Sequence, residues 1–180
     1  MASDTRSDRT GMDAATAVPC SAELLGADGP VSQGPLVWAA RHLARHHDDQ
    51  WRAEDLARVS VHDDRLLADL KRRIDAMNMV RSRLIDEIDA WVAANVPQNV
   101  RASLHTETLG SVIDRLCIAL VRANRLQKAP RSSARSELAR RQLTELASAY
   151  DHLTCEILSG SRRVPDWRTL KSYGPSATTA

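Results

Sequence analysis

One stripe of residues recurs at every third or fourth position through the middle of the chain, from Leu67 to Trp91. Its members are Leu67, Leu70, Ile74, Met77, Arg81, Leu84, Ile88 and Trp91, and Arg81 is the only charged residue among them. This spacing keeps one face of an α-helix against a partner helix, as in a coiled coil. It predicts a helix over residues 64–94, about 45 Å long at 1.5 Å per residue, which needs other helices to cover its stripe.

Three further helices are predicted around the long one. The first begins at Pro35, a residue that suits the first turn of a helix. Pro97 ends the long helix, Pro130 ends the next, and the last extends over residues 133–158 and stops before Gly160. The predicted fold class is therefore all-α, a bundle of four main helices with a long central helix and a C-terminal tail packed across it.

Composition divides the chain into three segments. Residues 1–34 are rich in Ser, Thr, Asp, Ala and Gly and have no sustained period, so we expect a mostly disordered N-terminal segment. Residues 35–160 are expected to form the helical bundle domain. Residues 161–180 form a basic tail with aromatic residues, expected to pack across the bundle.

The third predicted helix contains the most apolar run of the chain, Val112–Val121, in which Asp114 and Arg115 are the only charges. A helix that is apolar nearly all round lies inside a bundle, where an unpaired charge costs several kcal/mol or more. The run therefore predicts a polar site in the interior. Antiparallel packing of the long helix on the third is expected to bring Arg115 close to Asp86 or Asp89.

The same packing argument adds residues from the first helix. Its stripe is apolar at the start and polar further on: Leu36, Ala40, Leu43, His47, Gln50, Glu54 and Ala57. With the turn near residue 61, we expect Asp75 to lie level with His47, and Lys71 level with Trp51. The candidate site residues are Trp51, Glu54, Asp55, Arg58, Lys71, Asp75, Asn78, Arg81, Glu107, Asp114 and Arg115.

Three interpretations of this set remain open. Several basic groups beside an Asn suit a small anion such as a phosphate or a carboxylate, with acids orienting the basic groups. An equally weighted alternative is a purely structural network of ion pairs that fixes the helices in register. The third is an enzyme acting on a phosphorylated or sugar-linked metabolite, with Glu54, Asp75 or Asp114 as general acid or base. The partner of a non-enzymatic module would be the anion, another protein, or a second copy bound through the Trp91 end.

Several classes of function are disfavoured by composition. A net charge of +2 gives little long-range attraction for nucleic acid or membrane surfaces. Three cysteines without C-x-x-C spacing and an N-terminus without an apolar core favour a cytoplasmic protein with reduced thiols. His42, His46 and His47 lack the further ligands of a zinc site and are expected to be solvated surface histidines. No metal and no cofactor are predicted.

Three parts of the sequence resemble the bacterial domain-of-unknown-function 4254 family. They are Trp51-Arg-Ala-Glu-Asp-Leu-Ala-Arg58, then Lys71-Arg-Arg-Ile-Asp75 with Asn78 and Arg81, and Thr106-Glu-Thr-Leu-Gly-Ser-Val-Ile-Asp-Arg-Leu116. The Glu-Thr-x-Gly-Ser-x-Ile-Asp-Arg block is the specific part, and the resemblance extends roughly from Leu36 to Tyr173. It implies a small helical bacterial protein whose biochemistry is not established.

Overall fold

Helices form nearly all the regular structure of the computed structural model, which describes residues 18–26, 34–60, 62–128, 133–166 and 168. The helices are α1 (Ser21–Leu25), α2 (Pro35–Val59), α3 (Asp64–Asn95), α4 (Leu109–Gln127) and α5 (Ser133–Leu158). The all-α prediction is confirmed, and the four main helices begin and end within a few residues of the expected positions. Among the described helices, none combines the length and the apolar character needed to cross a membrane.

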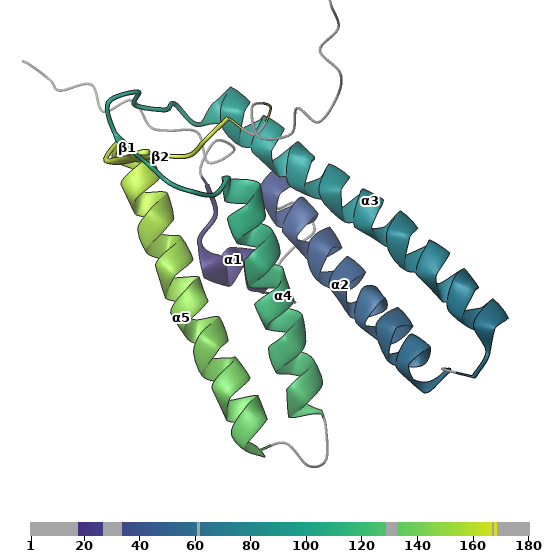
Figure 1. The fold of residues 1–180 in the computed structure, drawn as a ribbon. Helices are drawn as coiled ribbons and strands as arrows, with labels where there is room; N and C mark the ends of the chain where they lie inside the picture. The colour runs from purple at the N-terminus through teal and green to yellow at the C-terminus, as the bar shows by residue number, and fades with distance from the viewer. Residues whose placement is uncertain (1–17, 27–33, 61, 129–132, 167, 169–180) are drawn as a thin grey trace, which may run out of the picture.

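The helix α4 packs against the three other long helices, α2, α3 and α5 (Figure 1). The pairs α2–α3 and α4–α5 lie side by side along their lengths. Leu109, Ile113, Leu116 and Cys117 of α4 are almost completely buried. The most apolar run of the sequence therefore supplies the side chains that join the two pairs of helices.

The stripe of α3 faces inward as its spacing indicates. Leu70, Leu84 and Ile88 are buried, and the other members are partly buried. Arg81 is one of those partly buried residues. The polar positions beside the stripe, Lys71 among them, are exposed. The period of the sequence thus assigns the covered face of this helix correctly.

The short helix α1 was not expected, because it lies inside the segment predicted to be disordered. Val18 and Leu24 belong to the hydrophobic core. The backbone N–H and the hydroxyl of Ser21 donate to the two carboxylate oxygens of Asp151, each at 2.7 Å. A helix of one turn is too short to show a hydrophobic period, so its place depends on these tertiary contacts. Residues 1–17 and 27–33 of the predicted disordered segment lie outside the described residues.

Two strands of two residues each join the α3–α4 connection to the start of the tail. The strands β1 (Ser103–Leu104) and β2 (Arg162–Arg163) pair in parallel, and the backbone N–H of His105 donates to the carbonyl of Arg163 at 2.7 Å. Gly160 adopts a φ of 72°, the left-handed conformation that ends many helices. The start of the tail therefore packs across one end of the bundle (Figure 1), and residues 169–180 lie outside the described part of the chain.

Candidate functional site

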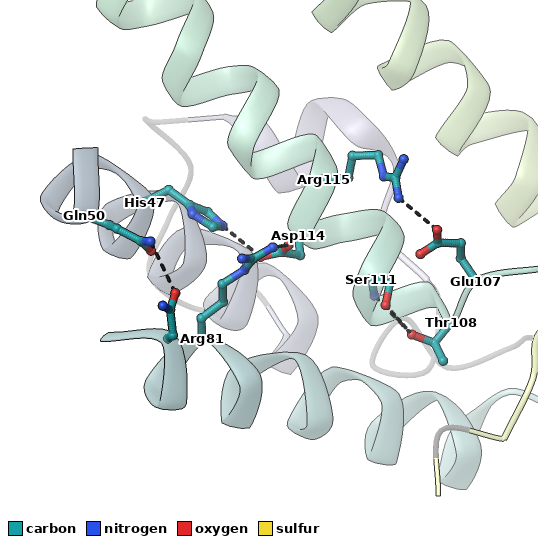
Figure 2. A network of polar contacts seen from close by, with 9 residues as sticks. His47, Gln50, Arg81, Glu107, Thr108, Ser111, Asp114 and Arg115 are labelled. Atoms are coloured by element: carbon teal, nitrogen blue, oxygen red, sulfur yellow. Dashed lines mark hydrogen bonds and ion pairs between the residues drawn. The ribbon is translucent and has the colours of Figure 1, made fainter. Parts of the chain in front are cut away.

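A buried carboxylate joins three helices at the centre of the candidate site. Asp114 of α4 is 3% exposed. Its Oδ1 accepts a hydrogen bond from His47 Nε2 of α2 at 2.8 Å and another from Arg81 Nε of α3 at 3.0 Å. Its Oδ2 accepts a further bond from Arg81 Nη2. Figure 2 shows His47 and Arg81 converging on Asp114 from their two helices.

The pKa values keep this group ionised. Burial acts to raise the pKa of Asp114, but the hydrogen bonds from His47 and Arg81 outweigh burial, so the pKa lies below its ordinary value. The hydrogen bond to Asp114 in turn raises the pKa of Arg81. Because an ionised carboxylate only accepts hydrogen bonds, His47 must present an N–H at Nε2. Asp114 and Arg81 therefore form a charged pair whose geometry His47 supports.

A cleft of about 230 Å³ opens beside this pair, and we call it the Arg81 cleft. Its lining comes from three helices and consists of His47, Gln50, Trp51, Glu54, Arg81, Ile118 and Val121. The side chain of Arg81 is 34% exposed, in contrast to the buried Asp114 behind it. The cleft thus combines one accessible guanidinium with an indole and aliphatic side chains.

The amide of Gln50 lies at the boundary between α2 and α3. Its Nε2 donates to Glu54 Oε1 at 3.2 Å and to Asn78 Oδ1 at 3.3 Å. Because the carboxylate of Glu54 can only accept, this bond fixes which end of the amide carries nitrogen. Gln50 Oε1 is buried and has no hydrogen-bond partner among the described residues.

The start of α4 is built to hold Asp114 in this position. The Thr108 side chain caps the helix by accepting from the backbone N–H of Ser111 at 3.1 Å. Asp89 of α3 accepts from the backbone N–H of Gly110 at 2.7 Å. A Cβ on Gly110 would lie 2.7 Å from Asp89 Oδ1 and 2.7 Å from the carbonyl oxygen of Ile85. Only a glycine lets α4 approach α3 this closely, which brings Arg81 within reach of Asp114.

The expectation that Arg115 lies in the interior beside Asp86 or Asp89 is wrong. Its side chain is 62% exposed and pairs with Glu107 at 2.8 Å, on the side of α4 away from Asp114 (Figure 2). The helices α2, α3 and α5 leave one strip of α4 facing solvent, and Ile118 lies on this strip with Arg115. Of the two charges in the apolar run, one belongs to the interior and the other to the surface.

The side chains of α2 and α3 that meet are not the pairs that the expected level brings together. His47 and Arg81 both bind Asp114, whereas Asp75 forms an exposed ion pair with Lys71 at 2.7 Å along α3. Side chains tilt toward the N-terminus of their own helix. When two side chains of antiparallel helices meet, their Cα atoms are therefore not level, because each Cα lies nearer the C-terminus of its own helix than the point of contact. A register counted from the turn pairs Cα atoms at the same level and does not include this displacement.

The candidate residues consequently separate into two groups. Trp51, Glu54 and Arg81 line the cleft, and Asp114 supports it from behind. Asn78 is exposed and reaches the site only through Gln50. The structure places the remaining six outside the cleft, as three exposed ion pairs on single helices or at a helix start: Asp55 with Arg58, Lys71 with Asp75, and Glu107 with Arg115.

Sequence reasoning missed His47 and Gln50 as site residues. His47 is buried, so the expectation of a solvated surface histidine is wrong for this residue. The signal was present, because both residues belong to the three-four stripe of α2. Partial burial lowers the pKa of the neighbouring His46. Within the described residues, no group of three or more His, Cys, Asp or Glu side chains could hold a metal ion.

Comparison with known proteins gives a family and nothing closer. No curated protein and no solved structure matches the chain. A family model described as "Protein of unknown function (DUF4254)" matches residues 38–165, which include all of α2 but its first three residues, together with α3, α4, α5 and the strand pair. The match covers well over half of the sequence, and the chain belongs to the DUF4254 family.

Proposed function

We propose that this protein binds a small molecule in the Arg81 cleft through an anionic group of the ligand, such as a carboxylate. The observation that carries the proposal is the position of the Arg81 guanidinium. Its Nε and Nη2 bind the buried Asp114, and among the described residues no hydrogen bond engages Nη1, so this amino group is available to a ligand. Arginine recognises a carboxylate through its planar set of N–H donors, and an orientation fixed in advance reduces the entropy lost on binding.

The size and lining of the cleft restrict the ligand further. Ligand pockets for drug-sized molecules measure roughly 300–1,000 Å³, and the Arg81 cleft is smaller at about 230 Å³. Trp51, Ile118 and Val121 supply apolar surface beside the guanidinium. The ligand expected from these features is a small carboxylate with an aliphatic body of a few carbon atoms.

A purely structural ion pair accounts for Asp114 and His47, but it does not require a cleft on the other side of Arg81. An enzymatic role has less support from the geometry. Of the three carboxylates considered as general acid or base, Glu54 alone lines the cleft. Asp114 is buried behind Arg81, and Asp75 is exposed on α3 in a pair with Lys71. We therefore propose binding and not catalysis.

The test compares two ligands that differ only in charge. Isothermal titration calorimetry is expected to show saturable binding of 4-methylpentanoate, and 4-methylpentanamide is expected to bind at least about tenfold more weakly, a difference of about 1.4 kcal/mol. Equal affinity for the acid and the amide would show that Arg81 does not select an anion. The proposal would be overturned if 4-methylpentanoate gave no heat of binding at concentrations up to about 10 mM. Such a result would mean a binding free energy weaker than roughly 3 kcal/mol.

Two variants of one residue locate the site. Ile118 lines the cleft and is 38% exposed, so a polar side chain can replace it without leaving a buried polar group unsatisfied. Ile118→Glu is expected to abolish binding of 4-methylpentanoate, because the new carboxylate competes for Arg81 and repels the ligand. Ile118→Gln has nearly the same shape without the charge and is expected to retain binding. If the two variants bind the ligand equally well, the cleft is not the binding site.

A further inference from the structure

We infer that the ligand carries a protonated amine next to its anionic group, so that its chemical class is a small aliphatic zwitterion of the α-amino acid type. This inference rests on the proposed function, because the anionic group is the one that Arg81 would hold. It adds a second recognition element, formed by Gln50 and Glu54 on α2. Both residues line the cleft.

Gln50 offers an acceptor that no other described residue uses. Its Nε2 faces Glu54 and Asn78, and this orientation follows from the acceptor-only carboxylate of Glu54. Its Oε1 is therefore directed elsewhere, and it is buried without a partner among the described residues. A buried acceptor without a partner costs free energy of about 1–3 kcal/mol, which a donor on a ligand would recover.

Glu54 offers a second acceptor, and this one is charged. Its Oε1 accepts from Gln50 at 3.2 Å, and its Oε2 lies 3.6 Å from Nη2 of Arg58, a side chain that is largely exposed. A contact of this length at the surface contributes little. A carboxylate has about four sites that accept hydrogen bonds, so Glu54 can take a further donor from a molecule in the cleft.

The charged side chains that line the cleft, Arg81 and Glu54, favour a ligand that carries charges of both signs. Arg81 is paired with Asp114, whose pKa lies below its ordinary value, so these two charges compensate each other. Glu54 then adds a negative charge to the lining. A simple anion that binds Arg81 would be repelled by Glu54, whereas a zwitterion would present its ammonium group to that carboxylate. Side chains of opposite charge that line one small cleft are complementary to a molecule that carries both charges.

The nature of the two acceptors also distinguishes an ammonium group from a hydroxyl. A hydroxyl has one donor and would satisfy either Gln50 or Glu54. An ammonium group has three donors and a positive charge, so it can satisfy both together. The expected order of affinity is therefore leucine first, then 2-hydroxy-4-methylpentanoate, then 4-methylpentanoate. These three molecules share one carbon skeleton and differ only at the carbon next to the carboxylate.

The experiment is a calorimetric titration of the full chain with these three ligands. Leucine is expected to bind at least about tenfold more tightly than 4-methylpentanoate, as sites built to hydrogen-bond a polar group discriminate against analogues that lack it. If 4-methylpentanoate binds and leucine binds no more tightly, the zwitterion inference is overturned and the proposed function stands; a water molecule on Gln50 Oε1 would produce this result. If neither ligand binds, both proposals fail.

A charge-neutral variant gives a second test with effects of opposite sign. Glu54→Gln is expected to weaken the binding of leucine and to strengthen the binding of 4-methylpentanoate, because the carboxylate that attracts one ligand repels the other. The matched control is Asp55→Asn, which removes an exposed carboxylate from the next position, outside the cleft. The control is expected to change neither affinity. If Glu54→Gln shifts both affinities in the same direction, Glu54 is not the partner of an amine.

Discussion

Replacing Arg81 by Met is expected to destabilise the fold strongly, because the substitution leaves a buried charge with one partner. Asp114 is 3% exposed and would lose both bonds from Arg81 while it keeps the bond from His47. Removing one partner of a buried ion pair costs about 3–5 kcal/mol. Because the Arg81 side chain is 34% exposed, water can replace part of the guanidinium, and we expect a loss of about 2–4 kcal/mol.

The matched control is Lys71→Met on the same helix. Lys71 also pairs with an aspartate, Asp75 at 2.7 Å, but both of these side chains are exposed. Exposed pairs contribute about 0–1 kcal/mol. Urea unfolding followed by far-UV circular dichroism at neutral pH measures both variants. With a slope of about 1–3 kcal/mol per M urea, a loss of about 2–4 kcal/mol should lower the midpoint of Arg81→Met by about 0.7 M or more. If Arg81→Met lowers the midpoint no more than Lys71→Met does, the buried pair does not stabilise the fold as argued.

Three further outcomes follow from other parts of the structure. The pKa of Asp114 is lowered in the folded state. The ionised Asp114 therefore stabilises the fold fully above the pKa of about 3.9 that an aspartate has in the unfolded chain, and this stabilisation is lost as the pH falls through the folded pKa. Urea midpoints measured in acid should therefore fall less steeply for Asp114→Asn than for the wild type, and parallel curves would contradict this. Gly110→Ala should cost about 1–3 kcal/mol by overpacking. Gly34→Ala has open space around its Cβ and should cost less, about 1 kcal/mol or below, because alanine is a poorer N-cap of α2 than glycine. An equal or larger loss for Gly34→Ala would refute the close approach of α4 to α3. Burial raises the pKa of the Cys117 thiol to about 12. A thiol reagent should therefore label the two exposed cysteines of the native protein and reach Cys117 only after unfolding. Rapid labelling of Cys117 in the native state would show that α4 is not packed as described.

The main helices could be predicted from the sequence because each of them carries its own evidence. The stripe of α3 from Leu67 to Trp91 is long enough to show its period, and prolines mark where α2 begins and where α3 ends. The helix α1 has only five residues and depends on Ser21 binding Asp151, a partner 130 positions away in the chain. No local pattern reports such a contact.

The candidate site was predictable in its centre and not in its detail. A carboxylate within an apolar run indicated that Asp114 is paired inside the bundle, and the break in the α3 stripe singled out Arg81. Arg115 has the same sequence environment as Asp114, and only the position of α5 and α2 around α4 decides which of the two faces solvent. The role of His47 was visible in the stripe of α2, but its partner Asp114 lies on α4, which does not directly follow α2 in the chain, so a register counted from a turn could not pair the two residues.

The most direct test of the account is whether a ligand in the Arg81 cleft is sensed by the indole of Trp51. The chain has four tryptophans, and among those that the structure describes Trp51 alone lines this cleft. In protein with isotope-labelled tryptophan, addition of 4-methylpentanoate should shift the Trp51 indole N–H signal saturably and leave the Trp38 and Trp91 signals in place, with Trp51→Phe assigning the signal. Saturable binding that leaves the Trp51 signal unmoved, or that shifts only the other indoles, would contradict the claim that the Arg81 cleft is the binding site.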